Sequence, residues 1–185
     1  MLQPNPYLFQ EAAAPRRGRP QDYTAQGVRS ALSLYQRARR RGWIGRIWSA
    51  LAGRSRCLLD LNRVERDCTV RGRHYAGTRT VPLDRIRGSE GRCRDFDRAF
   101  YPLRSHEKDR WLSIAVAREI GIGLPPVELV QVGDVYFVQD GHHRISVARM
   151  QGQRAVDAVV TVWDVAGPLP WEREAASGTL AGQPV

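Results

Sequence analysis

Residues 135–149 read VYFVQDGHHRISVAR, and this stretch decides the fold. A run of β-branched and aromatic residues ends at Asp140, and a helix-forming segment follows at once. The pattern predicts a strand, a tight turn at Gly141 and a helix that begins at about His142. Glycine permits so tight a turn because it lacks a Cβ. Since the first N–H groups of a helix have no acceptor inside it, this turn and Arg144 together predict an oxyanion site.

The segments around this stretch predict the other elements of a domain. Residues 127–132 are apolar and β-rich, a Gly-Asp pair follows, and residues 135–139 return, which predicts a β-hairpin. A helix is expected from Ser105 to Ile120, and a last strand over residues 156–163. This order of elements indicates an α+β fold: a small mixed sheet with packed helices, preceded by an N-terminal helical extension.

Composition along the chain predicts where the domain begins and ends. The start is rich in proline and arginine, and the end is rich in glycine, alanine and proline. A strand is expected near residues 78–86, where Pro82 favours an edge position. The predicted divisions are a disordered arm (1–22), a basic helical extension (23–56), a connector (57–80), the α+β domain (81–165) and a flexible tail (166–185).

The helical extension is expected to be two short helices. Apolar and basic residues alternate at helical spacing over residues 24–41, Gly42 interrupts the pattern, and a second apolar stripe follows over residues 43–51. The two segments predict a helical hairpin whose stripe packs on the rest of the protein. The alternatives are that the stripe meets a membrane surface or a partner helix.

Positive charge is concentrated at the N-terminal end. The net charge is +10, and residues 1–56 hold 11 arginines against two acidic residues. From residue 57 onward, 18 basic residues face 17 acidic ones. Such asymmetry indicates an arm that meets polyanions, or a helix that the arginines merely keep solvated. If the partner is DNA, the backbone contacts are expected from Arg37, Arg39, Arg40, Arg41 and Arg46.

Three cysteines without Cys-x-x-Cys spacing predict neither a disulfide framework nor a protein-ligated metal. One of them, Cys93, would be a reactive thiol if its arginine neighbours lowered its pKa. The sequence shows no apolar leader and no bilayer-spanning stretch. We therefore expect a cytoplasmic protein with no membrane partner; the sequence leaves its oligomeric state open.

Three motifs in order resemble the ParB/sulfiredoxin superfamily. They are residues 81–86 (VPLDRI), 122–129 (IGLPPVEL) and 140–144 (DGHHR). The resemblance implies a bacterial ParB-like domain of this fold. It does not by itself imply one activity, because one fold hosts different chemistries.

The branches of this superfamily differ at the third motif. Sulfiredoxins carry Gly-Cys-His-Arg, and here His142 replaces the cysteine, so sulfinic acid chemistry is not expected. Partition proteins carry Gly-Glu-Arg-Arg, of which only Gly141 and Arg144 match. The free serine kinases carry Asp-Gly-His-Thr-Arg, which differs here only at His143 and is the nearest local match.

The resemblance implies a nucleotide, ATP or CTP, or a small phosphorylated ligand, with Mg²⁺ brought by the nucleotide. It implies phosphoryl transfer or nucleotide hydrolysis as the reaction. The alternatives are a DNA-binding or ParB-like nuclease protein, and an adaptor without catalysis. The implied phosphate ligands are Gly141, His142, His143, Arg144, Arg92 and Arg94, and the implied catalytic residues are Glu90, Asp140 and His142. For single residues the alternatives are that Arg144 braces the helix through a carboxylate, that Asp140 caps it, and that Glu90 is solvated.

Overall fold

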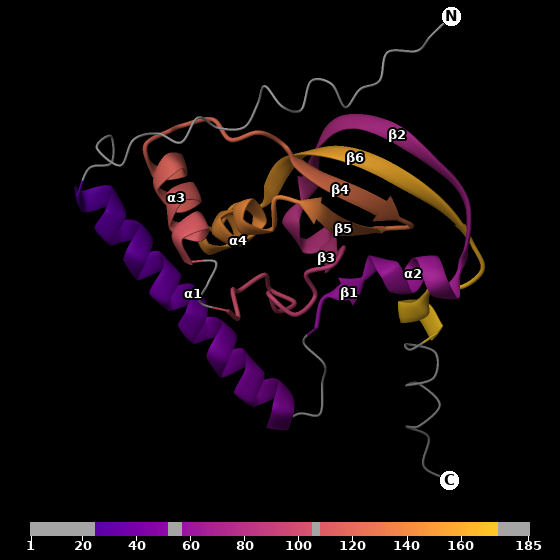
Figure 1. The fold of residues 1–185 in the computed structure, drawn as a ribbon, viewed down its shortest axis with the longest axis horizontal. Coiled ribbons are helices and arrows are strands. Elements are labelled where there is room, and N and C mark those ends of the chain that lie inside the picture. Colours follow the sequence, from indigo (N-terminus) through magenta and orange to yellow (C-terminus); the bar gives the residue numbers. More distant parts are fainter. Residues whose placement is uncertain (1–24, 52–56, 105–107, 174–185) are drawn as a thin grey trace, which may run out of the picture.

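A six-stranded sheet forms the centre of the protein in the computed structural model, which describes residues 25–51, 57–104 and 108–173 (Figure 1). The strand order is β1-β3-β5-β4-β6-β2. Antiparallel pairs join β4 to β5 and β2 to β6, and the other pairs are parallel. The strands are β1 (Leu59–Asp60), β2 (Thr69–Pro82), β3 (Ile86–Ser89), β4 (Val127–Val132), β5 (Val135–Asp140) and β6 (Ala155–Ala166).

Helices cover this sheet, which confirms the predicted α+β class with a mixed sheet and an N-terminal helix. The helices are α1 (Ala25–Leu51), α2 (Leu61–Asp67), α3 (Lys108–Glu119) and α4 (His142–Met150), with a 3-10 turn, η4, at Leu83–Arg85. The hairpin β4–β5, the helix α4 and the last strand β6 lie where the sequence predicts them. The predicted N-cap of α3, Ser105, lies outside the described residues.

Apolar side chains fill both faces of the sheet. Along β4, Val127 and Leu129 pack in one cluster with Ile145 of α4, whereas Val130 and Val132 pack in another with α2. Successive side chains of a strand point to opposite faces, so a strand buried on both faces has a continuous apolar sequence. This explains why residues 127–132 lack a polar alternation.

The strand β2 begins earlier than expected. The sequence placed a connector over residues 57–80, but this part of the chain holds β1, α2 and most of β2, which pairs with β6 from Thr69 to Pro82. Only Val81 of β2 is fully buried. Because an edge strand exposes most of its side chains, it lacks the apolar alternation that marks strands in a sequence. Pro82 does lie in an edge strand, as predicted.

The N-terminal extension is one continuous helix, so the predicted helical hairpin is wrong. Gly42 lies inside α1, where a Cβ would stand 3.1 Å from the Cβ of Tyr101. Gly42 therefore does not break the helix. It lets α1 come close to the loop between β3 and α3, which contains Tyr101. The predicted packing of the second apolar stripe is also wrong, because Trp43 and Trp48 are 64% and 68% exposed.

The helix α1 reaches the sheet through α3 and α4. Tyr35 packs edge-on against Trp111 of α3, with ring centroids 5.3 Å apart. The indole Nε1 of Trp111 donates a hydrogen bond to Ser146 of α4 at 2.9 Å. Figure 1 shows α1 (indigo) running along the outside of α3, with its C-terminal end extending away from the sheet. These contacts leave the opposite side of α1 exposed.

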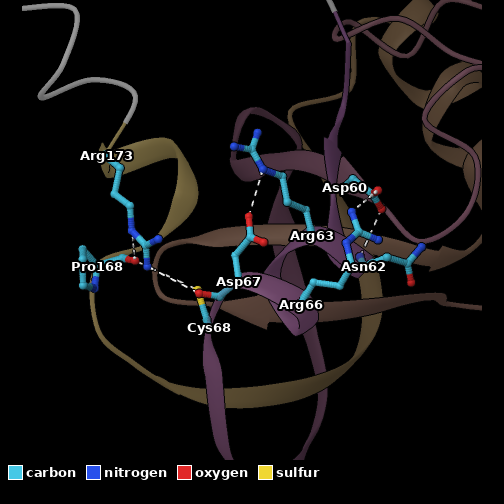
Figure 2. Close-up of polar contacts among 8 residues, drawn as sticks. All are labelled: Asp60, Asn62, Arg63, Arg66, Asp67, Cys68, Pro168 and Arg173. Atoms are coloured by element: carbon cyan, nitrogen blue, oxygen red, sulfur yellow. Dashed lines mark hydrogen bonds and ion pairs between the residues drawn. The ribbon is translucent and has the colours of Figure 1, made fainter.

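The described chain continues past β6 to Arg173 and packs on the domain, in a part of the chain where the sequence predicts a flexible tail (166–185); residues 174–185 of that tail lie outside the described residues. Leu169 is buried in the same cluster as α2, and Trp171 contacts Phe137. Figure 2 shows how Arg173 secures this turn: it donates to the carbonyl oxygens of Pro168 (3.1 Å) and Asp67 (3.5 Å). The carboxylate of Asp60 caps the start of α2, as the same view shows.

Within the described ranges, none of the helices combines the length and apolarity that crossing a membrane requires.

Candidate anion-binding site

The first turn of α4 presents its backbone N–H groups at a tight bend. Gly141 has φ +96°, and the first helical hydrogen bond runs from Ile145 N to the Gly141 carbonyl oxygen. The N–H groups of residues 142–144 therefore have no acceptor within the helix. A Cβ on Gly141 would stand 2.6 Å from Cγ1 of Val127, so both the backbone angle and the space require glycine.

A small cavity of about 40 Å³ opens at this end of α4. Arg92, from the loop after β3, and Arg110, from the first turn of α3, stand on its wall beside the residues of the turn, Asp140 to Arg144. The structure thus brings together the predicted residues Arg92, Asp140, Gly141, His142, His143 and Arg144. It adds Arg110, which no motif indicated, because the closeness of α3 to α4 is a tertiary contact.

The guanidinium of Arg144 is engaged by the protein itself. Its Nη1 donates to the carbonyl oxygens of Pro125 (2.6 Å) and Pro126 (2.7 Å), and its Nη2 pairs with the carboxylate of Asp140. The Arg144 side chain is only 13% exposed. The geometry therefore favours the bracing alternative over the direct phosphate contact that the motif implied.

Charges around Arg144 act in both directions on its pKa. Burial lowers the pKa most; the carboxylates of Asp140 and Glu128 raise it, and the positive charge of Arg110 lowers it. Arg110 is thus near enough to repel Arg144. The wall of the cavity holds three arginines, Arg92, Arg110 and Arg144, and one carboxylate, Asp140, so positive charge is in excess there.

His142 is held in the interior. Its Nε2 lies 2.7 Å from the hydroxyl of Ser89, and its ring stacks on Phe96 with centroids 5.8 Å apart. His142 is 4% exposed and Ser89 is fully buried. A serine beside a histidine resembles an activated nucleophile, but here Phe96 covers the ring and the hydroxyl is out of solvent. The pair fixes the start of α4 against β3, and the sequence could not reveal it because the two residues lie 53 positions apart.

His143 has the same burial, 4% exposed, and its ring meets the edge of Phe96 at a centroid distance of 5.3 Å. Both imidazoles are therefore enclosed. Both residues line the cavity at the start of α4.

The loop after β3 contributes Arg92 but not the other predicted residues. Glu90 accepts a hydrogen bond from Gln139 Nε2 at 2.8 Å, and it does not line the cavity. Arg94 is exposed and also lies off the cavity wall. The condition for a reactive Cys93 is not met, because burial raises its pKa to about 11 and electrostatic interaction with Asp60 and Cys57 raises it further.

The five arginines predicted to contact DNA are all exposed on α1. None of them belongs to the wall of the cavity at α4. Arg144 also lines a second, larger hollow of about 320 Å³, whose wall includes Arg118 and Asp157. Burial lowers the pKa of Arg118.

The similarity of this chain to known proteins is weak. No protein-family model and no curated protein matches the sequence. Among solved structures, sulfiredoxin from Arabidopsis thaliana matches with 18% identity, over 56% of this chain and 96% of that chain, with a TM-score of 0.33. A likeness of this degree extends to neither a ligand nor an activity.

Proposed function

We propose that the N-terminal end of α4 binds the phosphate group of a nucleotide or another small phosphorylated molecule. The observation that carries the proposal is the pair Arg92 and Arg110, which two separate elements bring to the first turn of α4. Backbone N–H groups at a helix start and flanking guanidinium groups are a recurrent arrangement for binding phosphate.

The volume of the cavity fits one small group. A cavity of about 40 Å³ holds roughly three water-sized groups at 10–15 Å³ each. A phosphate group has similar bulk, whereas a whole nucleotide does not fit. The remainder of the ligand, whether ATP, CTP or another phosphate ester, would therefore lie outside the cavity.

The roles of the predicted residues divide into contact and support. Arg92, Arg110 and the backbone of residues 142–144 contact the phosphate. Arg144 is a positioning residue, because it ties the Pro125-Pro126 strap and Asp140 to the start of α4. His142 positions the same turn through Ser89.

Magnesium would enter with a nucleotide. Asp140 is the carboxylate on the cavity wall, and its Oδ2 pairs with Arg144. No group of three His, Cys, Asp or Glu residues that could hold a metal occurs among the described residues. Magnesium commonly takes one or two protein carboxylates plus substrate phosphates, so Asp140 fits as a single ligand. Bound there, the ion would neutralise phosphate charge.

Phosphoryl transfer or hydrolysis would need a base at the cavity. Asp140 is on the wall, and its side chain is 57% exposed, whereas the carboxylate of Glu90 is bonded to Gln139. Asp140 is therefore the better candidate of the two, as an alternative to its role as a magnesium ligand, because a bound cation would weaken it as a base. Release of inorganic phosphate from ATP or CTP that disappears in Asp140→Asn and persists in Glu90→Gln would support this assignment.

Thermal shift with ATP, CTP and inorganic phosphate, each with and without Mg²⁺, tests the binding proposal. At a ligand concentration 100 times Kd, binding stabilises the folded protein by about 2.7 kcal/mol. We expect a rise in Tm for the wild type and a loss of that rise in Arg92→Ala/Arg110→Ala.

The matched control is Arg85→Ala, which removes an exposed arginine away from the cavity. It should keep the full rise in Tm. A wild type that responds to none of the probes, or a double variant that responds as strongly as the wild type, would refute the proposal.

A further inference from the structure

The C-terminal half of α1 presents an apolar surface to solvent. We call it the outer stripe, and its members are Trp43, Ile44, Ile47, Trp48 and Leu51. They are among the most exposed large apolar residues of the described chain, and Leu51 reaches 77%. Apolar residues exposed singly are ordinary, but a contiguous set on one face marks an interaction surface.

The outer stripe lies opposite the face by which α1 packs on the domain. The packed face is Ala31, Tyr35, Ala38, Gly42 and Gly45, all buried. Ile44 follows the inward Gly42 by two positions, and Ile47 follows the inward Gly45 by two. Two positions turn an α-helix by about 200°. A flat surface can therefore lie along the outer stripe without touching the domain.

Arginines lie next to the outer stripe, toward the N-terminal end of α1. Arg40 precedes Ile44 by four positions, which places it on the same outward side. Arg37, seven positions before Ile44, is exposed at the edge of that side, where α1 and α3 enclose a hollow. Residues 25–51 contain six arginines and no acidic residue. The outward side thus changes from basic to apolar along its length, and its partner must offer negative charge beside an apolar interior.

We infer that the outer stripe docks on a bilayer that contains anionic lipid, with α1 lying in the plane of the membrane surface. Tryptophan and aliphatic side chains enter the boundary between headgroups and acyl chains, and arginines bind anionic headgroups. This mode needs no spanning helix, so it agrees with the absence of one among the described residues. It also does not depend on the phosphate site at α4.

Other partners fit the outer stripe less well. A second copy of the chain would bring another helix with six arginines and no acidic residue against the first, which charge repulsion opposes. DNA would satisfy the arginines and could stack on the tryptophans, but its phosphate backbone offers nothing to Ile44, Ile47 and Leu51.

Sedimentation of the full chain with vesicles tests the inference. We expect binding at physiological ionic strength to vesicles of equal parts phosphatidylcholine and phosphatidylglycerol, and none to phosphatidylcholine alone. Trp43→Ser/Trp48→Ser should weaken binding by about tenfold or more. In the wild type, lipids brominated on the acyl chain should quench part of the tryptophan emission, which a purely electrostatic contact would not do.

Two controls match the substitutions. Tyr75→Ser removes a ring that is 69% exposed on β2, and it should leave binding unchanged. Arg37→Glu/Arg40→Glu should weaken binding by about tenfold or more, whereas Arg71→Glu/Arg85→Glu makes the same change in net charge at exposed sites elsewhere and should weaken it much less. All these residues are exposed, so the far-UV circular dichroism of each variant should match the wild type.

Four results would overturn the inference. The first is absence of binding to the anionic vesicles, and the second is equal loss in the two charge-reversal variants, which would show attraction by net charge alone. The third is a dimer in solution that Trp43→Ser/Trp48→Ser disrupts. The fourth is duplex DNA binding that needs the same tryptophans, in place of vesicle binding.

Discussion

Arg144 braces the start of α4 through contacts within the protein. Its guanidinium accounts for three acceptors, two of them main-chain carbonyl oxygens in the strap before β4. Those carbonyl groups would lose their partner if the side chain were removed, and the carboxylate of Asp140 would lose its cation. The residue therefore sets the distance between the strap and the start of α4.

Removing this side chain should cost stability. We expect Arg144→Ala to lower the free energy of unfolding by about 2–4 kcal/mol, because hydrogen bonds to charged groups contribute about 1.5–3 kcal/mol each and a broken ion pair leaves a charge uncompensated. Arg144→Lys should recover only part of the lost stability, since an ammonium group cannot reproduce the planar guanidinium that reaches all three acceptors. Urea denaturation measures both, and an Arg144→Ala protein as stable as Arg85→Ala would contradict the bracing role.

Cys93 should be a slow thiol. Its Sγ contacts the carbonyl oxygens of Ser89 (3.5 Å) and Leu59 (3.6 Å), and burial raises its pKa to about 11. Only the thiolate reacts with alkylating reagents, and at pH 8 a thiol of this pKa is about 0.1% ionised. We expect iodoacetamide to modify the exposed Cys57 before Cys93.

The pH dependence gives this prediction its sign. A raised pKa means that the thiolate appears only at higher pH, so modification of Cys93 should accelerate as pH rises from 9 toward 11. Peptide mass spectrometry follows each cysteine separately, and unfolding in urea should make all three react. Modification of Cys93 at pH 8 as fast as that of Cys57 would contradict the prediction.

At the scale of elements, β3 has no room for a side chain at Gly88. Gly88 pairs with Phe137 of β5, and a Cβ on Gly88 would stand 2.1 Å from Cδ1 of that ring. Phe137 is fully buried. The ring occupies the space that any side chain at position 88 would need, so the two strands can pair in this register only with glycine there.

Gly88→Ala should destabilise the protein by about 1–3 kcal/mol or more, as forced overpacking does. Adding Phe137→Leu to Gly88→Ala should restore part of the lost stability, because leucine has no ring atoms at the position where the new Cβ must lie. The control is Gly123→Ala, where no atom lies within 4 Å of the added Cβ. Unfolding midpoints in urea measure all three, and equal stability of Gly88→Ala and Gly123→Ala would contradict the packing.

At the scale of the whole molecule, helices stack outward from one face of the sheet. Ile145 joins α4 to the sheet, Trp111 joins α3 to α4 through Ser146, and Tyr35 joins α1 to α3. The cavity at α4 receives Arg110 from α3, so the same stacking that carries α1 also completes the proposed phosphate site. The other face is closed by α2 and the C-terminal turn.

Charge follows this layering. The outermost layer, α1, holds six arginines and no acidic residue, whereas residues 57–185 are nearly neutral. A basic outer layer can meet an extended anionic surface by its field, and a near-neutral domain must hold its ligand by local geometry. The two proposals therefore concern different partners and fail independently.

The sequence alone determined the elements whose signal is local. The hairpin of β4 and β5, the bend at Gly141 and the start of α4 follow from propensity, turn chemistry and apolar periodicity over a few neighbouring residues. The mixed α+β class followed from their order, and the edge position of β2 from Pro82. These features need no knowledge of what the chain meets elsewhere.

Only the tertiary structure decided what each polar group of the site does. Arg144 takes the carbonyl groups of a strap 18 and 19 positions away, Ser89 meets His142 across 53 positions, and Arg110 reaches the cavity from another helix. Likewise, the sequence predicts a packed helical hairpin, whereas the structure has one continuous α1 with its outer stripe exposed to solvent. Partners and burial depend on which distant surfaces come into contact, and short-range propensity carries no information about that.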